Sequence, residues 1–149
     1  MILEGDIMDE KDIILSEREA YYVKCNMLLK WLELQRNKVS FKDYLNQKGY
    51  NTIAIYGIGI LGQQLYESFL EEQIPIEYVM DRNRKIELKD LTIFSNDDER
   101  KKVDVIIVTP IMDYYDIKAD ITQFESEKII SLKTLIEDMY FECLISPYS

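Results

Sequence analysis

The feature that most constrains the fold is a set of glycines at positions 57, 59 and 62, between an apolar segment and a helical pattern. Residues 52–56 form a nearly continuous, β-branched apolar run of strand length, as expected for a strand buried on both faces of a parallel sheet. From Ile60 to about Glu72, apolar residues recur at helical spacing. A Gly-x-Gly-x-x-Gly sequence between a strand and a helix is typical of a phosphate-binding turn.

The rest of the chain alternates between strand-like and helix-like patterns. Further strands are predicted at residues 76–80, 91–94, 103–108 and 128–131. Helices are predicted at residues 60–72, 113–124 and 132–139, with a short helical stretch near 95–102. This alternation implies an α/β fold with a Rossmann-like open parallel sheet of about five strands in the order 3-2-1-4-5. We expect this domain to span residues 50–149, after a helical extension over residues 1–49.

The extension contains a helix that is apolar around much of its circumference. The sequence Ser16-Glu17-Arg18-Glu19 resembles a capping box and predicts a helix over residues 17–36. Ser40 starts a second, shorter helix that stops at Gly49. An apolar stripe formed by Tyr21, Cys25, Leu28 and Leu32 is widened by Trp31 and its neighbours. Such a helix must be buried, either against the protein's own sheet or in a homodimer through residues 17–36.

The turn offers a specific role to each of its glycines. Gly57 permits the tight turn, Gly59 lets a diphosphate approach the backbone, and Gly62 lets the helix pack closely on the strand. The free amides of Ile60 and Leu61 and the positive end of the helix dipole attract an anion. We therefore predict that all five residues contact a nucleotide-type cofactor, the alternative being that the glycines serve only packing.

Four other residues are expected beside this turn. Asp81 ends the second strand about 20 residues after the turn, where an acid typically accepts a ribose hydroxyl. The neighbouring Arg82 favours a 2′-phosphate or the diphosphate of a sugar nucleotide, unless it belongs to a solvated turn. Thr109 and Pro110 follow the fourth strand and are expected to face the same crevice, although proline also simply ends a strand.

Charge and composition exclude several classes of function. The chain has 18 Lys and Arg residues against 28 Asp and Glu residues, a net charge of −10. A protein this acidic repels phosphate backbones and anionic lipids, so neither nucleic acid nor a membrane is an expected partner. The amino terminus is acidic, unlike a signal peptide, and no apolar run is long enough to span a bilayer. Cys25 and Cys143 lie in apolar stretches and are expected to be buried thiols, which indicates a cytoplasmic protein.

Candidate catalytic groups are few. Histidine is absent, which removes the commonest general base and metal ligand. Tyr114 and Lys118 have the Tyr-x-x-x-Lys spacing of short-chain dehydrogenases, but they lie too close to the glycine turn and lack a serine partner. The acidic run at residues 97–99 is better explained by a helix amino terminus than by a metal. We therefore assign no catalytic and no metal-binding residue, and we favour a chain that is not an enzyme.

The stretch from Thr52 to Asn83 contains Ile-Tyr-Gly-Ile-Gly-Ile-Leu-Gly and Val-Met-Asp-Arg-Asn. It resembles the nucleotide-binding-like domains of bacterial surface-polysaccharide biosynthesis proteins. It is similar in particular to the amino-terminal domain of sialic-acid and bacillosamine-type sugar acyltransferases. The resemblance implies ligand contacts at Gly57, Gly59, Gly62 and Asp81. Those enzymes continue into a β-helix of hexapeptide repeats with a catalytic histidine, which this sequence lacks, so acyl transfer is not implied.

These observations predict non-catalytic binding of a nucleotide-type ligand, NAD(P) or a nucleotide-sugar, with a role in surface-polysaccharide biosynthesis. Two alternatives stay open. One is a degenerate Rossmann-like interaction module without a ligand, which associates through its first helix. The other is a subunit of a small oxidoreductase whose substrate-binding walls come from a partner, because the sheet ends within about 20 residues of the last residue.

Overall fold

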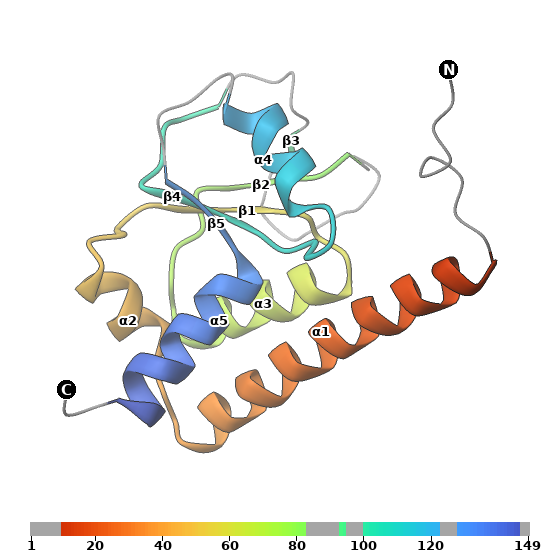
Figure 1. Cartoon of the computed structure of the whole chain (residues 1–149). Helices are drawn as coiled ribbons and strands as arrows, with labels where there is room; N and C mark the ends of the chain where they lie inside the picture. Colours follow the sequence, from red (N-terminus) through yellow and green to blue (C-terminus); the bar gives the residue numbers. More distant parts are fainter. Residues whose placement is uncertain (1–9, 83–92, 95–99, 123–127, 147–149) are drawn as a thin grey trace.

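The computed structural model describes residues 10–82, 93–94, 100–122 and 128–146. These residues form a five-stranded parallel sheet in the order β3-β2-β1-β4-β5 (Figure 1). The strands are β1 (Ile53–Tyr56), β2 (Tyr78–Met80), β3 (Ile93–Phe94), β4 (Val105–Val108) and β5 (Lys128–Ser131). The predicted α/β fold and the predicted strand order are both confirmed.

Helices cover the two faces of the sheet unequally. They are α1 (Glu10–Arg36), α2 (Phe41–Gln47), α3 (Ile60–Glu71), α4 (Tyr114–Thr122), α5 (Leu132–Tyr140) and the π-helical turn η2 (Phe141–Ile145). Helices α1, α3 and α5 lie on one face of the sheet and α4 lies on the other (Figure 1). None of the helices that the structure describes is long and apolar enough to cross a membrane.

The two faces have separate cores because side chains alternate along each strand. In β1, Ile53 and Ile55 pack with residues of α1, α2, α3 and α5, whereas Ala54 and Tyr56 pack with residues of α4. All four residues of β1 are buried, and so are all four of β4. Burial on both faces explains why these strands are continuous apolar runs instead of alternating patterns.

Helices α1 and α5 extend beyond their predicted bounds. Helix α1 begins at Glu10, so Ser16 is an exposed residue inside the helix and is not its amino-terminal cap. Residues 10–15 contain neither glycine nor proline, so nothing in them stops a helix that forms downstream. Helix α5, predicted to end at Met139, continues to Tyr140 and into η2. Capping signals are local, and a helix that packs along the body can extend through them.

The predicted start of α2 at Ser40 is confirmed, and a distant carboxylate reinforces it. The Ser40 hydroxyl accepts a hydrogen bond from the Asp43 amide at 3.1 Å. It also donates to Glu72 Oε1 at 2.7 Å. The amides of Phe41 and Lys42 donate to the same carboxylate, at 3.0 and 3.1 Å. Glu72, at the end of α3, therefore satisfies the free amides of α2 and ties the two helices together.

Candidate functional site

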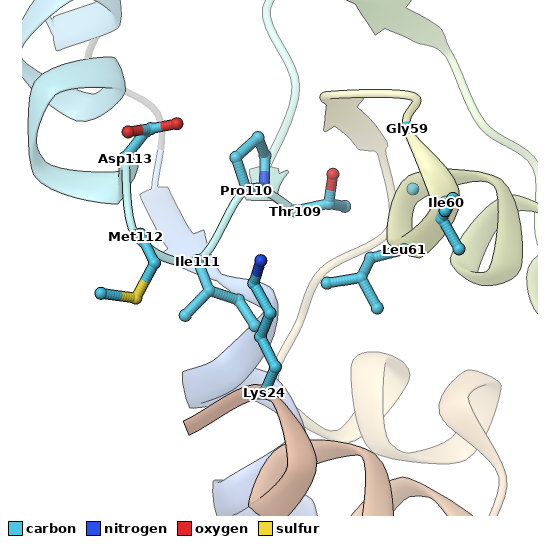
Figure 2. Close-up of a pocket in the computed structure, with 10 residues that line it drawn as sticks. Lys24, Gly59, Ile60, Leu61, Thr109, Pro110, Ile111, Met112 and Asp113 are labelled. Carbon is cyan, nitrogen blue, oxygen red and sulfur yellow. The ribbon is translucent and has the colours of Figure 1, made fainter. Parts of the chain in front are cut away.

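A cleft of about 290 Å³ opens at the carboxyl ends of β1 and β4 (Figure 2). Its walls come from the first turn of α3, the segment after β4 and one side chain of α1. The lining residues are Lys24, Gly59, Ile60, Leu61, Gly62, Thr109, Pro110, Ile111, Met112 and Asp113. The cleft lies where the strand order reverses, which is where open α/β sheets bind their ligands.

Two of the three glycines are required by the packing of the turn itself. Gly57 has a φ of +93°, a conformation that other residues rarely adopt. A Cβ atom there would also lie 2.6 Å from Pro110 Cδ and 2.7 Å from Thr109 Oγ1. A Cβ atom on Gly62 would fall onto the carbonyl oxygen of Gly57. Gly57 thus makes the turn and Gly62 allows the helix to approach the strand, as the sequence predicts.

Gly59 differs because the space beside it is open. A Cβ atom on this residue would meet no atom of the described residues within 4 Å. Gly59 is the amino-terminal cap of α3, and within the described part of the chain no side chain caps the helix there. The first amides of an α-helix have no partner within the helix, and the residues that carry these amides in α3, Ile60, Leu61 and Gly62, line the cleft. This corner can accept a ligand atom without moving the protein.

Thr109 and Pro110 line the cleft as expected, but the threonine hydroxyl already has partners. Thr109 is buried, and its hydroxyl donates to the carbonyl oxygen of Gly57 at 2.7 Å. The carbonyl oxygen of Tyr56 is a second acceptor, 3.1 Å from the same hydroxyl. The hydroxyl therefore holds the glycine turn against the end of β4. Pro110 packs beside Gly57 and shapes the same wall.

Asp81 lies beside the glycine turn, as expected, but neither Asp81 nor Arg82 is among the residues that line the cleft. Asp81 Oδ2 accepts a hydrogen bond from the amide of Ile58 at 2.7 Å, so this carboxylate secures the glycine turn from within. The exposed Arg82 guanidinium lies 3.7 Å from the carboxylate of Asp120 in α4. The sequence places Asp81 correctly at the end of β2. It does not show that the glycine turn folds back onto Asp81, so that the Ile58 amide donates to one of the carboxylate oxygens.

The cleft contains the amine of Lys24, a cation that was not predicted from the sequence. Lys24 extends from α1 between Leu61 and Ile111, and its amine points toward Thr109 and Pro110 (Figure 2). Among the residues that the structure describes, no carboxylate forms an ion pair with Lys24. A signal for this position exists in the sequence, since Lys24 precedes the buried Met27 and Trp31 by three and seven residues and so lies close to their side of the helix.

The segment after β4 adds a rim of mixed chemistry that was also missed. Met112 is 54% exposed, and Ile60 on the opposite wall is 89% exposed. Asp113 precedes α4 and provides the carboxylate at this rim. The cleft thus has an open corner lined by amides, one amine, one carboxylate and two exposed apolar side chains.

The other candidate groups lie away from the cleft. The Tyr114 hydroxyl donates to the carbonyl oxygen of Ile129 in β5 at 3.1 Å, and the Lys118 amine lies 5.9 Å from the centre of the Tyr114 ring. This tyrosine hydroxyl is used to hold α4 on the sheet and does not face the glycine turn. The acidic run at 97–99 lies outside the described residues.

Several groups with shifted pKa values lie between α2 and the end of α5. Burial, and then the charge of Glu142, raises the pKa of Asp138. Burial and the same glutamate raise the pKa of the Cys143 thiol and of the Tyr44 hydroxyl. The Lys48 amine lies 3.0 Å from Glu142 Oε1 and stabilises that charge. A thiol with a raised pKa carries little thiolate near neutral pH and is a weak nucleophile, and the ion pair between Lys48 and Glu142 joins the end of α2 to η2.

No protein-family model matches this chain, and comparisons with curated proteins and with solved structures return no significant match. The function of the cleft therefore follows only from the chemistry of the residues that line it.

Proposed function

We propose that the cleft binds a nucleotide-type ligand through its phosphate groups. The observation that carries this proposal is the convergence of three features on one corner: the open space at Gly59, the free amides of the first turn of α3, and the amine of Lys24. Backbone amides at a helix start and a nearby cation are the groups that bind phosphate in many proteins.

The surrounding charge makes this corner distinctive. The chain as a whole carries a net charge of −10, which repels anions over most of the surface. The half-buried Lys24 lies between apolar side chains, where its attraction for an anion is screened less than on the open surface. A phosphate that reaches this corner gains both the amide hydrogen bonds and a charge-assisted contact with Lys24.

The rest of the cleft suits the remainder of a nucleotide. The exposed side chain of Met112 offers apolar surface to a base or nicotinamide ring, and the carboxylate of Asp113 can accept a hydrogen bond from a ribose hydroxyl. Asp113 therefore takes the role that the sequence suggested for Asp81. The ligand classes in this proposal are NAD(P) and nucleotide-sugars. The second class and a link to surface-polysaccharide synthesis depend on the sequence resemblance, whereas a cytoplasmic location depends on the interpretation of both cysteines as free thiols.

Binding without catalysis is part of the proposal. Apart from Lys24 and Asp113, the side chains of the described residues that line the cleft carry no group that commonly transfers protons, since the Thr109 hydroxyl is held by backbone carbonyls. Tyr114 and Lys118 belong to the packing of α4 on β5.

The test is a thermal-shift panel of NAD, NADP, UDP-sugars, coenzyme A and S-adenosylmethionine, followed by calorimetry of any compound that stabilises the protein. A ligand that binds the native state raises Tm by mass action. Gly59→Asp should abolish the shift, because it adds a negative side chain where the phosphate is expected. Aspartate is a favoured amino-terminal cap, so this variant should keep its fold. Lys24→Ala should weaken binding roughly tenfold, as expected for loss of one charged hydrogen bond.

The matched control is Lys102→Ala, which removes the same charge from an exposed position before β4, at the opposite end of the strand. This variant should bind like the parent protein. If a ligand binds Gly59→Asp and Lys24→Ala as tightly as the parent, the site lies elsewhere. If no compound with a phosphate group raises Tm, the interaction module without a ligand becomes the better explanation.

A further inference from the structure

The outer face of α1 is an exposed apolar surface. Met27, Trp31 and Leu34 face the body and are at most 2% exposed. On the other side of the helix, Tyr21 and Tyr22 are 72% and 71% exposed. Leu28, Leu29 and Leu32 are 39%, 55% and 59% exposed, and Cys25, which the sequence predicted to be buried, is exposed too. The outer face of α1 therefore has no partner among the residues that the structure describes.

The exposed residues have the spacing of a coiled-coil seam. Tyr21, Cys25, Leu28 and Leu32 follow one another at intervals of four, three and four residues, which corresponds to alternating a and d positions. The intervals are the same in both directions along the helix. An antiparallel pair of these helices, related by a two-fold axis, therefore matches every a position with a d position. Tyr21 then contacts Leu32 of the partner subunit, and Cys25 contacts Leu28 of the partner subunit.

We propose that a second copy of this chain covers this face, with the two α1 helices antiparallel across a two-fold axis. The exposed parts of the two tyrosines, the three leucines and the neighbouring Ile60 amount to roughly 700 Å², close to the ~800 Å² that each partner contributes to a standard interface. This proposal does not rest on the proposed ligand.

Charge selects the antiparallel arrangement. The exposed Arg18 continues the seam toward the amino terminus, and the exposed Gln35 continues it toward the carboxyl terminus. A parallel pair would place Arg18 directly against Arg18 of the partner subunit, which is unfavourable. The antiparallel pair places Arg18 against Gln35 of the partner subunit, where the guanidinium can donate to the amide oxygen.

The shape of the surface agrees with a helix as its occupant. A groove of about 310 Å³ runs between α1 and α3, lined by Leu28, Trp31, Leu32, Gln35, Ile60, Leu61 and Gln64. Ile60 is 89% exposed at the edge of this groove, so a helix packed on the seam can cover it. The amino-terminal part of α1 extends past the sheet, which leaves room for the partner helix (Figure 1). A lipid surface is a weaker candidate, because the exposed Glu17 and Glu19 flank the face and the chain is strongly acidic.

Sedimentation equilibrium of the full chain tests the association. The parent protein should have twice the chain mass of 17.7 kDa at micromolar concentration. Leu32→Glu should give a monomer with unchanged circular dichroism, because this exposed side chain contributes to the seam and not to the core. Leu70→Glu makes the same change at a leucine of α3 that is 49% exposed, and this control should remain dimeric. A parent protein that is monomeric, or a Leu32→Glu variant that is still dimeric, would overturn the proposal.

Disulfide formation tests the register. One variant carries Cys143→Ser and keeps Cys25 as its single thiol; a second carries Cys143→Ser, Cys25→Ser and Leu28→Cys. Under mild oxidation the antiparallel seam predicts a cross-linked dimer only when the two variants are mixed, because position 25 then faces position 28. Strong cross-linking of each variant alone would indicate a parallel pair and would overturn the antiparallel assignment. Binding of a monomeric parent to anionic vesicles would identify the face as a lipid contact instead.

Discussion

At the amino ends of the strands, carboxylates of the protein itself accept hydrogen bonds from backbone amides. At the carboxyl ends, the first turn of α3 has no such cap among the residues that the structure describes. Glu72 binds the amides of Phe41 and Lys42, and Asp104 Oδ2 binds those of Asn51 and Thr52 at 2.8 and 3.0 Å. At the other end, no side chain of the described residues caps α3 at Gly59.

This difference separates amides that stabilise the fold from amides that can bind a ligand. An amide that already donates to an internal carboxylate gains little from an external anion. Both kinds of amide occur near the glycine turn. The amide of Ile58 donates to Asp81, whereas the corner at Gly59, beside the first amides of α3, is open. The half-buried Lys24 faces this open corner, so a single site offers both free donors and positive charge.

The largest expected effect is a difference in unfolding free energy between variants of Gly62 and Gly59. Gly62→Ala should destabilise the protein by about 3 kcal/mol, because its Cβ would overlap the carbonyl oxygen of Gly57 and force the helix away from the strand. Gly59→Ala should change stability by less than about 1 kcal/mol, since its Cβ would meet open space and its φ of −69° suits alanine. Urea unfolding of both variants measures the difference. Equal losses would show that the corner at Gly59 is part of the packing.

A smaller effect is expected at the amino ends of the strands. Glu72→Ala removes the acceptor for two backbone amides and the Ser40 hydroxyl, and should cost about 2 kcal/mol of unfolding free energy. The matched control is Glu71→Ala, which removes an exposed carboxylate from the same turn of α3 and should stay within about 0.5 kcal/mol of the parent. Chemical denaturation compares the two. If both variants lost the same stability, the carboxylate of Glu72 would have no special role.

The smallest effect concerns Asp104 and depends on pH. Hydrogen bonds from the amides of Thr52 and Asn51 lower the pKa of Asp104. A carboxylate with a lowered pKa contributes stability above its unfolded pKa of 3.8, and this contribution is lost as the pH falls through the folded pKa. Asp104→Asn should therefore lower Tm at pH 7 by on the order of 1–3 °C. The gap should close as the pH falls below about 4. A gap of constant size from pH 7 to pH 3 would mean that the charge of Asp104 is not involved.

The sequence was most informative where local patterns act alone. The apolar runs of β1 and β4, the helix after Gly59 and the roles of Gly57 and Gly62 follow from periodicity and from the conformational demands of the turn. It was wrong about the start of α1, because the capping signal at Ser16 lies within a segment that stays helical through to Glu10. It was also wrong about Cys25, since an apolar stripe does not indicate which of two apolar faces meets the body.

The candidate site required contacts between distant segments. Lys24 reaches the cleft only because α1 packs on the same side of the sheet as α3, and Asp81 is unavailable there because the glycine turn folds back onto it. Local spacing places Lys24 near the buried side of its helix, but it does not indicate which segment lies opposite, because each of these contacts joins residues that are far apart in the chain.

By itself, the sequence determined a parallel α/β sheet with a phosphate-type turn, because strand burial, helical periodicity and glycine conformation are properties of neighbouring residues. Only the tertiary structure decided which amides stay free, which carboxylates are used internally and which lysine faces the open corner. The physical reason is that an amide or a carboxylate can form its hydrogen bond with a partner from any part of the chain. Tertiary packing decides which partner that is.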